Sequence, residues 1–150
     1  MKIQLSFALR KIGRIRLDSL DNRINFQKTI YLLKEMGAIK EHYHFSWYIF
    51  GPYSSEAAKD GFNLINDDTD KIINVSEDFD DKINKFKELK GHGGREIKWL
   101  ELLSCIHYIR KKETKEKDEV FKILKTKKPY FDNINLFNRG WKTVNAFFSS

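Results

Sequence analysis

Cysteine is almost absent from this 150-residue chain, which has a single one, Cys105. One thiol excludes an intrachain disulfide framework and any zinc or iron–sulfur site made of clustered cysteines. No apolar run approaches the ~20 residues of a membrane-spanning helix, so we expect no membrane association. The first apolar stretch ends at Arg10 and Lys11, too early for a secretory signal. With a free thiol as well, the sequence predicts a cytoplasmic protein.

Apolar residues, by contrast, are plentiful. Hydrophobic residues make up 41% of the chain and aromatic residues 14%, with 12 Phe. This content excludes a wholly disordered chain. A chain of this length buries roughly 70% of its unfolded surface, enough for a core without disulfides. No internal repeat or low-complexity segment is present, and the length predicts one domain or two small lobes.

Positive charge is in excess and unevenly distributed. The chain has 28 Lys and Arg against 21 Asp and Glu, a formal net charge of +7. Residues 67–81 carry 1 basic and 7 acidic side chains, whereas residues 82–150 carry 17 basic and 8 acidic ones. The basic half indicates a polyanionic partner or an acidic face on a partner protein. The competing explanation is base composition, since the abundant Lys, Ile and Asn all have AT-rich codons.

Apolar periodicity predicts helices along most of the chain. The clearest helix spans 23–36, where Phe26, Ile30 and Leu33 form one stripe and Gly37 gives a stop signal. Its apolar surface is broad, so we expect a largely buried central helix. Other helices are predicted at about 5–12 (with a strand as the alternative), 55–65, 78–90, 95–112, 115–126 and within 131–148.

Further details of these helices are also predicted. Asp21 or Asn22 suits the N-cap of the central helix. In the helix at 55–65, we expect Ala58, Phe62 and Ile65 to share the buried face. The apolar stripes predicted for the later helices are Phe79, Ile83, Phe86 and Leu89 at 78–90, Leu100, Leu103, Ile106 and Ile109 at 95–112, and Leu136, Trp141, Val144 and Phe148 within 131–148.

Aromatic and β-branched residues are concentrated at 42–50, which predicts a strand. Gly51 and Pro52 then end it in a fixed turn, and Ser54 suits the N-cap of the next helix. A short strand at 72–75 is the expected partner in a two-stranded wing.

The glycine-rich break at 91–94 is the best candidate for a lobe boundary. The predicted fold class is mainly α (α+β). We expect a winged-helix-like lobe at 1–90 with a small two-stranded β wing. A helical lobe at 91–150 would pack on it to make one compact domain.

Few residues suggest catalysis or metal binding. His42 and His44 would lie on one face of a strand, but no third ligand is near in the sequence, and exposed edge histidines are the favoured interpretation. Ser54 and Ser55 do not form a nucleophile elbow. The stretch 91–95 is glycine-rich before a helix but lacks a P-loop ending.

Two charged segments have competing interpretations. The acidic run at 67–81 does not match a calcium loop and is best explained as a solvated loop and helix start, with a metal-dependent nuclease as the distant alternative. The basic segment could follow a phosphate backbone, although acidic residues interrupt it and a solvated face is favoured. Its candidate binding residues are Lys111, Lys112, Lys115, Lys122, Lys125, Lys127 and Lys128.

Two motifs together resemble a known family. The block at 24–33 contains Gln27-Lys28 followed by Tyr31, and the block at 48–54 ends in Gly-Pro-Tyr-Ser. This pattern resembles the YwgA-like proteins and is similar to the Panacea (SocA-like antitoxin) domain. The motif residues are Gln27, Lys28, Tyr31, Tyr48, Gly51, Pro52, Tyr53 and Ser54.

The resemblance implies a helix-rich, winged-helix-like core without catalytic residues, in an antitoxin that neutralises a toxin-like protein or presents it to a protease. We expect no metal and no cofactor. The alternative is a winged-helix regulator that binds duplex DNA. In either case the motif residues are expected to be structural. We predict that Gln27 ties its helix to the wing by a side-chain hydrogen bond, and that Tyr48 and Tyr53 bury their rings.

Overall fold

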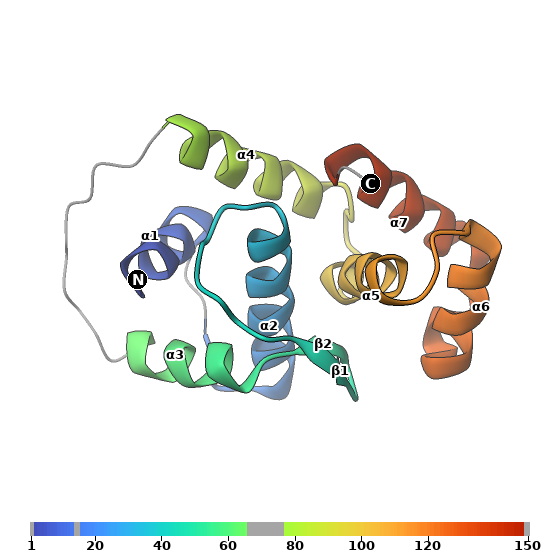
Figure 1. Ribbon diagram of the computed structural model, residues 1–150, viewed down its shortest axis with the longest axis horizontal. Coiled ribbons are helices and arrows are strands. Elements are labelled where there is room, and N and C mark those ends of the chain that lie inside the picture. Colours follow the sequence, from blue (N-terminus) through green and yellow to red (C-terminus); the bar gives the residue numbers. More distant parts are fainter. Residues whose placement is uncertain (1, 14–15, 66–76, 149–150) are drawn as a thin grey trace. The chain divides into compact units, whose positions relative to one another are not determined.

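The structure is a computed structural model that describes residues 2–13, 16–65 and 77–148 (Figure 1). Within these residues the chain is mainly α-helical, with one small β wing, as predicted. The elements are α1 (Lys2–Ile12), α2 (Leu20–Glu35), β1 (Ser46–Tyr48), β2 (Gly51–Tyr53), α3 (Ser55–Ile65), α4 (Glu77–Gly91), α5 (Trp99–Lys112), α6 (Lys117–Lys127), the 3-10 helix η1 (Pro129–Phe131) and α7 (Ile134–Phe147).

The chain divides into two compact units, Met1–Glu88 and Leu89–Ser150. We call them the N-terminal unit and the C-terminal unit. None of the helices described is both long and apolar enough to cross a membrane.

The central helix of the N-terminal unit is α2, and it is as buried as predicted. Every residue from Phe26 to Leu33 is buried. Its N-cap, however, is Ser19, whose Oγ accepts a hydrogen bond from the backbone N–H of Asn22 at 3.1 Å. The predicted caps Asp21 and Asn22 were wrong because the helix begins earlier, at Leu20.

The wing is a hairpin of neighbouring segments, which corrects two predictions. β1 pairs antiparallel with β2, with Tyr48 opposite Gly51, so the strand is shorter than 42–50 and its partner is the next segment of the chain. The predicted partner at 72–75 lies outside the described residues. Gly51 has φ +93°, a conformation that favours glycine, and this lets the chain reverse after a two-residue loop.

The face of α3 also differs from the prediction. Ala57 and Gly61 are buried, whereas Phe62 is 54% exposed and Ala58 is half-buried. A Cβ atom on Gly61 would lie 2.5 Å from Cζ of Phe26, so α3 approaches α2 through its smallest residues. Close approach on this side turns the large Phe62 ring outward.

Helix α4 shows the predicted apolar stripe. Phe79, Ile83, Phe86 and Leu89 are all buried. Its Lys82 Nζ donates a hydrogen bond to the carbonyl oxygen of Gly37 at 3.3 Å, which joins α4 to the turn after α2.

In the C-terminal unit α5 packs against α6 and α7, and its predicted stripe is buried: Leu100, Leu103, Ile106 and Ile109. The helix begins at Trp99 and not at 95, because residues 92–98 form turns. A Cβ on Gly93 would lie 2.2 Å from Cγ of Trp99, so the indole covers this turn. The indole Nε1 donates to the carbonyl oxygen of Leu89 at 3.0 Å.

Helix α7 lies close to α5 at a glycine. A Cβ on Gly140 would lie 2.9 Å from Cδ1 of Ile106. Of the apolar residues predicted here, Val144 and Phe148 are buried, whereas Leu136 and Trp141 are only half-buried.

Candidate functional site

The Gln27 side chain joins α2 to the end of the wing, as predicted. Its Nε2 donates to the carbonyl oxygen of Ser54 at 2.9 Å, and its Oε1 accepts from the Ser54 N–H at 2.9 Å. Both bonds are buried, and together they pair the side-chain amide of Gln27 with the backbone N–H and carbonyl of Ser54. The Ser54 Oγ accepts from the Ala57 N–H at 3.2 Å, which confirms Ser54 as the N-cap of α3.

Lys28 makes a second connection from the same helix. Its Nζ donates to the carbonyl oxygen of Pro52 at 2.7 Å, and the residue is only 2% exposed. A buried ammonium is costly unless it is hydrogen-bonded, and this carbonyl is one such partner. Gln27 and Lys28 together hold residues 52–54 against α2.

The aromatic residues of the motif differ in burial. Tyr31 is 1% exposed and meets the Phe45 ring edge-on, with centroids 5.2 Å apart. Tyr53 is half-buried, and its ring lies 5.3 Å from that of Tyr48. Tyr48 itself is 57% exposed, so the prediction that it buries its ring is wrong. The short hairpin leaves this ring at the surface.

An apolar pocket opens between α2, the wing and α3. Its cavity volume is about 200 Å³. Its walls include Leu20 and Ile24 of α2, Tyr48, Phe50 and Tyr53 of the wing segment, and Phe62 of α3. Leu20, Tyr48 and Phe62 are each more than half exposed, at 52%, 57% and 54%. In Figure 1 the hairpin lies beside α2, and α3 leaves directly from β2.

The charges in the pocket are of one sign. Arg23 and Lys28 line it, and no Asp or Glu does. Lys28 is buried, whereas Arg23 is exposed and its Nη1 donates to the carbonyl oxygen of Leu17 at 3.2 Å. The wing residues 46–53 carry no charged side chain. The pocket is therefore an apolar surface with a cation at its edge.

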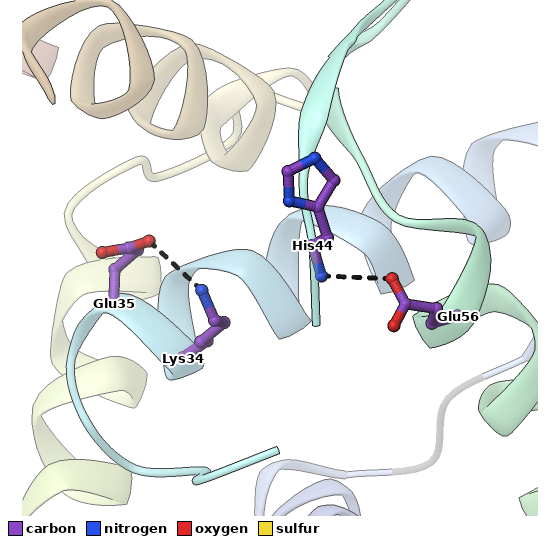
Figure 2. Close-up of polar contacts among 4 residues, drawn as sticks. All are labelled: Lys34, Glu35, His44 and Glu56. Carbon is purple, nitrogen blue, oxygen red and sulfur yellow. Dashed lines mark hydrogen bonds and ion pairs between the residues drawn. The ribbon is translucent and has the colours of Figure 1, made fainter. Parts of the chain in front are cut away.

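The histidines of the predicted pair lie in the segment before the wing. His42 and His44 are both exposed, while Tyr43 between them is buried. Figure 2 shows that the His44 backbone N–H donates to Oε1 of Glu56, at 3.3 Å, while its ring points away from that carboxylate. The described residues contain no group of three His, Cys, Asp or Glu side chains that could hold a metal ion.

Figure 2 also shows the Nζ of Lys34 and Oε1 of Glu35, which lie 3.8 Å apart near the end of α2. The two side chains are neighbours in sequence and partly buried, and at this distance they form a long ion pair.

Acidic side chains are partly buried beside Tyr43. The Tyr43 hydroxyl donates to Oδ2 of Asp60 at 2.7 Å, and burial and this carboxylate raise the pKa of Tyr43 above its usual range. Glu41 is 6% exposed, and neither of its carboxylate oxygens has a hydrogen-bond partner among the described residues. Burial raises the pKa of Glu41.

The C-terminal unit has a comparable tyrosine–carboxylate pair. The Tyr130 hydroxyl donates to Oε2 of Glu101, and burial together with Glu101 raises the pKa of Tyr130. The ammonium of Lys98 lies 3.6 Å from the Tyr130 ring centroid, a cation–π contact.

The predicted basic residues do not all lie at the surface. Lys128 is 5% exposed, and burial lowers its pKa. The other candidates lie at the end of α5, in the following turn and on α6, where all are exposed except the half-buried Lys125: Lys111, Lys112, Lys115, Lys122, Lys125 and Lys127. Exposed Glu113, Glu116, Asp118 and Glu119 lie among them.

The remaining candidates are placed as follows. Ser54 is 1% exposed and caps α3. The turn at 91–95 is held by Arg139, whose Nη2 donates to the carbonyl oxygen of His92 at 3.1 Å. Residues 67–76 of the acidic run lie outside the described residues. Glu77, Asp78 and Asp80 fall in the first turn of α4, and Asp81 lies in the same helix.

Sequence reasoning missed the pocket and Arg23. Leu20 and Ile24 are spaced i, i+4 on the side of α2 away from its buried stripe, and that second apolar stripe is the only signal. The rest of the pocket depends on how the hairpin folds back on the helix.

No family model, no curated protein and no solved structure matches the chain. Function must therefore be argued from the residues and their geometry.

Proposed function

We propose that this chain is a non-catalytic, antitoxin-like regulatory module. It binds a partner protein through the pocket between α2, the wing and α3. The main support for this proposal is the group of exposed apolar side chains around the pocket: Leu20, Tyr48 and Phe62. Exposed apolar side chains gathered around a cavity are a feature of protein interaction sites. The motif similar to the Panacea domain points the same way.

The size of the pocket supports a protein partner over a small-molecule substrate. Its volume of about 200 Å³ is below the roughly 300–1,000 Å³ of ligand pockets. It suits one side chain from another protein, the kind of buried anchor that dominates binding energy at interfaces.

The wing supports protein binding over DNA binding. Affinity for DNA comes largely from Lys and Arg that neutralise phosphates. Residues 46–53 contain neither, and their exposed side chains at Tyr48 and Ile49 are apolar. A wing of this composition favours contact with a protein surface.

Single substitutions at exposed positions test the proposal. Tyr48→Asp and Phe62→Asp place a charge at the pocket, and Ile97→Asp is the matched control, since Ile97 is 86% exposed in the C-terminal unit. A partner is first identified by capture with the tagged full chain, then purified and titrated. We expect about tenfold or greater loss of affinity for the two pocket variants and none for Ile97→Asp. Equal affinity for all three would reject the pocket as the binding site.

A second candidate, duplex DNA binding, is favoured only by the exposed lysines of α6. It predicts binding that falls steeply with salt and is weakened in Lys122→Glu. Fluorescence anisotropy with a labelled duplex at ~50 mM salt separates the two functions. Under our proposal the duplex binds weakly or not at all.

A further inference from the structure

We infer that the pocket takes one apolar side chain from an acidic segment of the partner, and that a carboxylate beside this side chain pairs with Arg23. The inference rests on the proposed function and adds the chemistry of the partner to it.

The charges around the pocket carry the inference. Both charged residues that line it are cations, so an acidic segment is complementary to it and a basic one is not. The Lys28 ammonium is buried and bonded to Pro52, which leaves Arg23 as the exposed cation of the lining. No described carboxylate forms an ion pair with Arg23.

The guanidinium group suits this role. It presents several N–H donors in one plane, a geometry that matches a carboxylate. The Leu17 carbonyl accepts from Nη1 of Arg23 at 3.2 Å, which restrains the group beside the pocket and leaves its other donors for a ligand.

The volume limits the anchor to one side chain. An apolar cavity of about 150 Å³ is known to hold benzene. The pocket is slightly larger, at about 200 Å³, and its walls include the aromatic residues Tyr48, Phe50 and Phe62. A phenylalanine or leucine fits, and aromatic walls favour the former through ring contacts.

Peptide probes test the chemistry without the natural partner. Four capped seven-residue peptides share Ser-Gly and Gly-Ser ends and carry Asp-Phe-Asp, Lys-Phe-Lys, Ser-Phe-Ser or Asp-Ala-Asp at the centre. Each is titrated into the full ¹⁵N-labelled chain, and amide shifts around the pocket give the affinity. We expect Asp-Phe-Asp to bind about two- to fivefold more tightly than Ser-Phe-Ser, and Lys-Phe-Lys and Asp-Ala-Asp to be the weakest.

A charge reversal at one position provides the matched control. Arg23→Glu should prefer Lys-Phe-Lys over Asp-Phe-Asp, whereas Arg16→Glu, which changes the net charge equally but does not line the pocket, should retain the original order. Reversal in both variants would assign the preference to overall charge and overturn the role of Arg23.

The outcomes distinguish this inference from the proposed function. Equal binding of the three Phe peptides at the pocket overturns the acidic segment while protein binding stands. Asp-Ala-Asp binding as tightly as Asp-Phe-Asp overturns the apolar anchor. Absence of shifts at millimolar peptide overturns the inference as a whole, and the proposed function is then decided separately by partner affinity in Phe62→Asp.

Discussion

The central helices of the two units, α2 and α5, are both buried but use their polar residues differently. In α2 the buried Gln27 and Lys28 reach the backbone of residues 52–54. In α5 the Ser104 hydroxyl donates to Leu100 of its own helix, and Glu101 accepts from the Tyr130 hydroxyl. Two side chains of α2 therefore hold the backbone of the wing. In α5, Ser104 bonds within its own helix and Glu101 bonds to a side chain, while Trp99 in the first turn bonds to the carbonyl oxygen of Leu89.

The difference shows how the two units position their secondary-structure elements. Hydrogen bonds are directional, so the two side chains bonded to the backbone at 52–54 fix the position of the wing against α2. The wing in turn forms one wall of the pocket. The C-terminal unit combines hydrogen bonds from Trp99 and Arg139 to the backbone with close contact at Gly93 and Gly140, and this contact positions helices and turns.

The largest effect is expected from removing the hydrogen bonds that join α2 to the wing. Gln27→Ala leaves the buried N–H of Ser54 without its partner and removes one of the two donors to the Ser54 carbonyl oxygen, which keeps the Ala58 N–H. We expect a loss of about 3 kcal/mol in the free energy of unfolding. The control is Asn25→Ala, at an exposed position of the same helix, which should change it by less than about 0.5 kcal/mol. Urea unfolding measures both, and equal midpoints would mean that Gln27 does not hold the wing.

The next largest effect is expected from disturbing the close contact at Gly93 in the C-terminal unit. Gly93→Ala would place a Cβ 2.2 Å from the Trp99 ring, and we expect it to destabilise the protein by about 2 kcal/mol. Gly91→Ala is the matched control, because a Cβ there meets nothing within 4 Å and the residue ends α4. It should be neutral or stabilise by about 0.5 kcal/mol. Thermal unfolding of both variants is the measurement, and similar losses would contradict a steric cause.

The smallest effects concern one buried ionisable group in each unit, and their signs are opposite. The pKa of Glu41 is raised above its ordinary 4.5, so the folded state binds the proton more tightly and stability falls as pH rises above 4.5. The pKa of Lys128 is lowered below 10.5, so stability rises as pH approaches 10.5 from below.

Two neutral variants separate these groups. Glu41→Gln should remove the fall above pH 4.5 and leave the alkaline rise, and Lys128→Met should do the reverse. Urea midpoints across the pH range measure this. A wild-type slope retained in Glu41→Gln would show that another group causes it.

Much of the fold was predictable because it depends on local periodicity. The buried stripes of α4 and α5, the burial of α2 and the cap at Ser54 follow from spacing and residue type alone. The bond from Gln27 to the wing was also predicted, and it is confirmed.

The errors arise where distant segments meet. Phe62 looked like a core residue, but contact between Gly61 and Phe26 selects another face of α3. Pro52 looked like a strand end, but the positive φ of Gly51 lets the chain turn earlier and makes Pro52 part of β2. The pocket escaped prediction for the same reason, since its walls come from three elements.

The amide of Gln27 has a consequence for self-association. It engages the Ser54 N–H and carbonyl as the peptide group of an adjacent strand would. Two residues before Ser54, Pro52 has no N–H to donate, and its carbonyl oxygen already accepts from Nζ of Lys28. Side chains of α2 occupy the backbone groups along this edge of the hairpin, so a strand of another molecule cannot extend the sheet there.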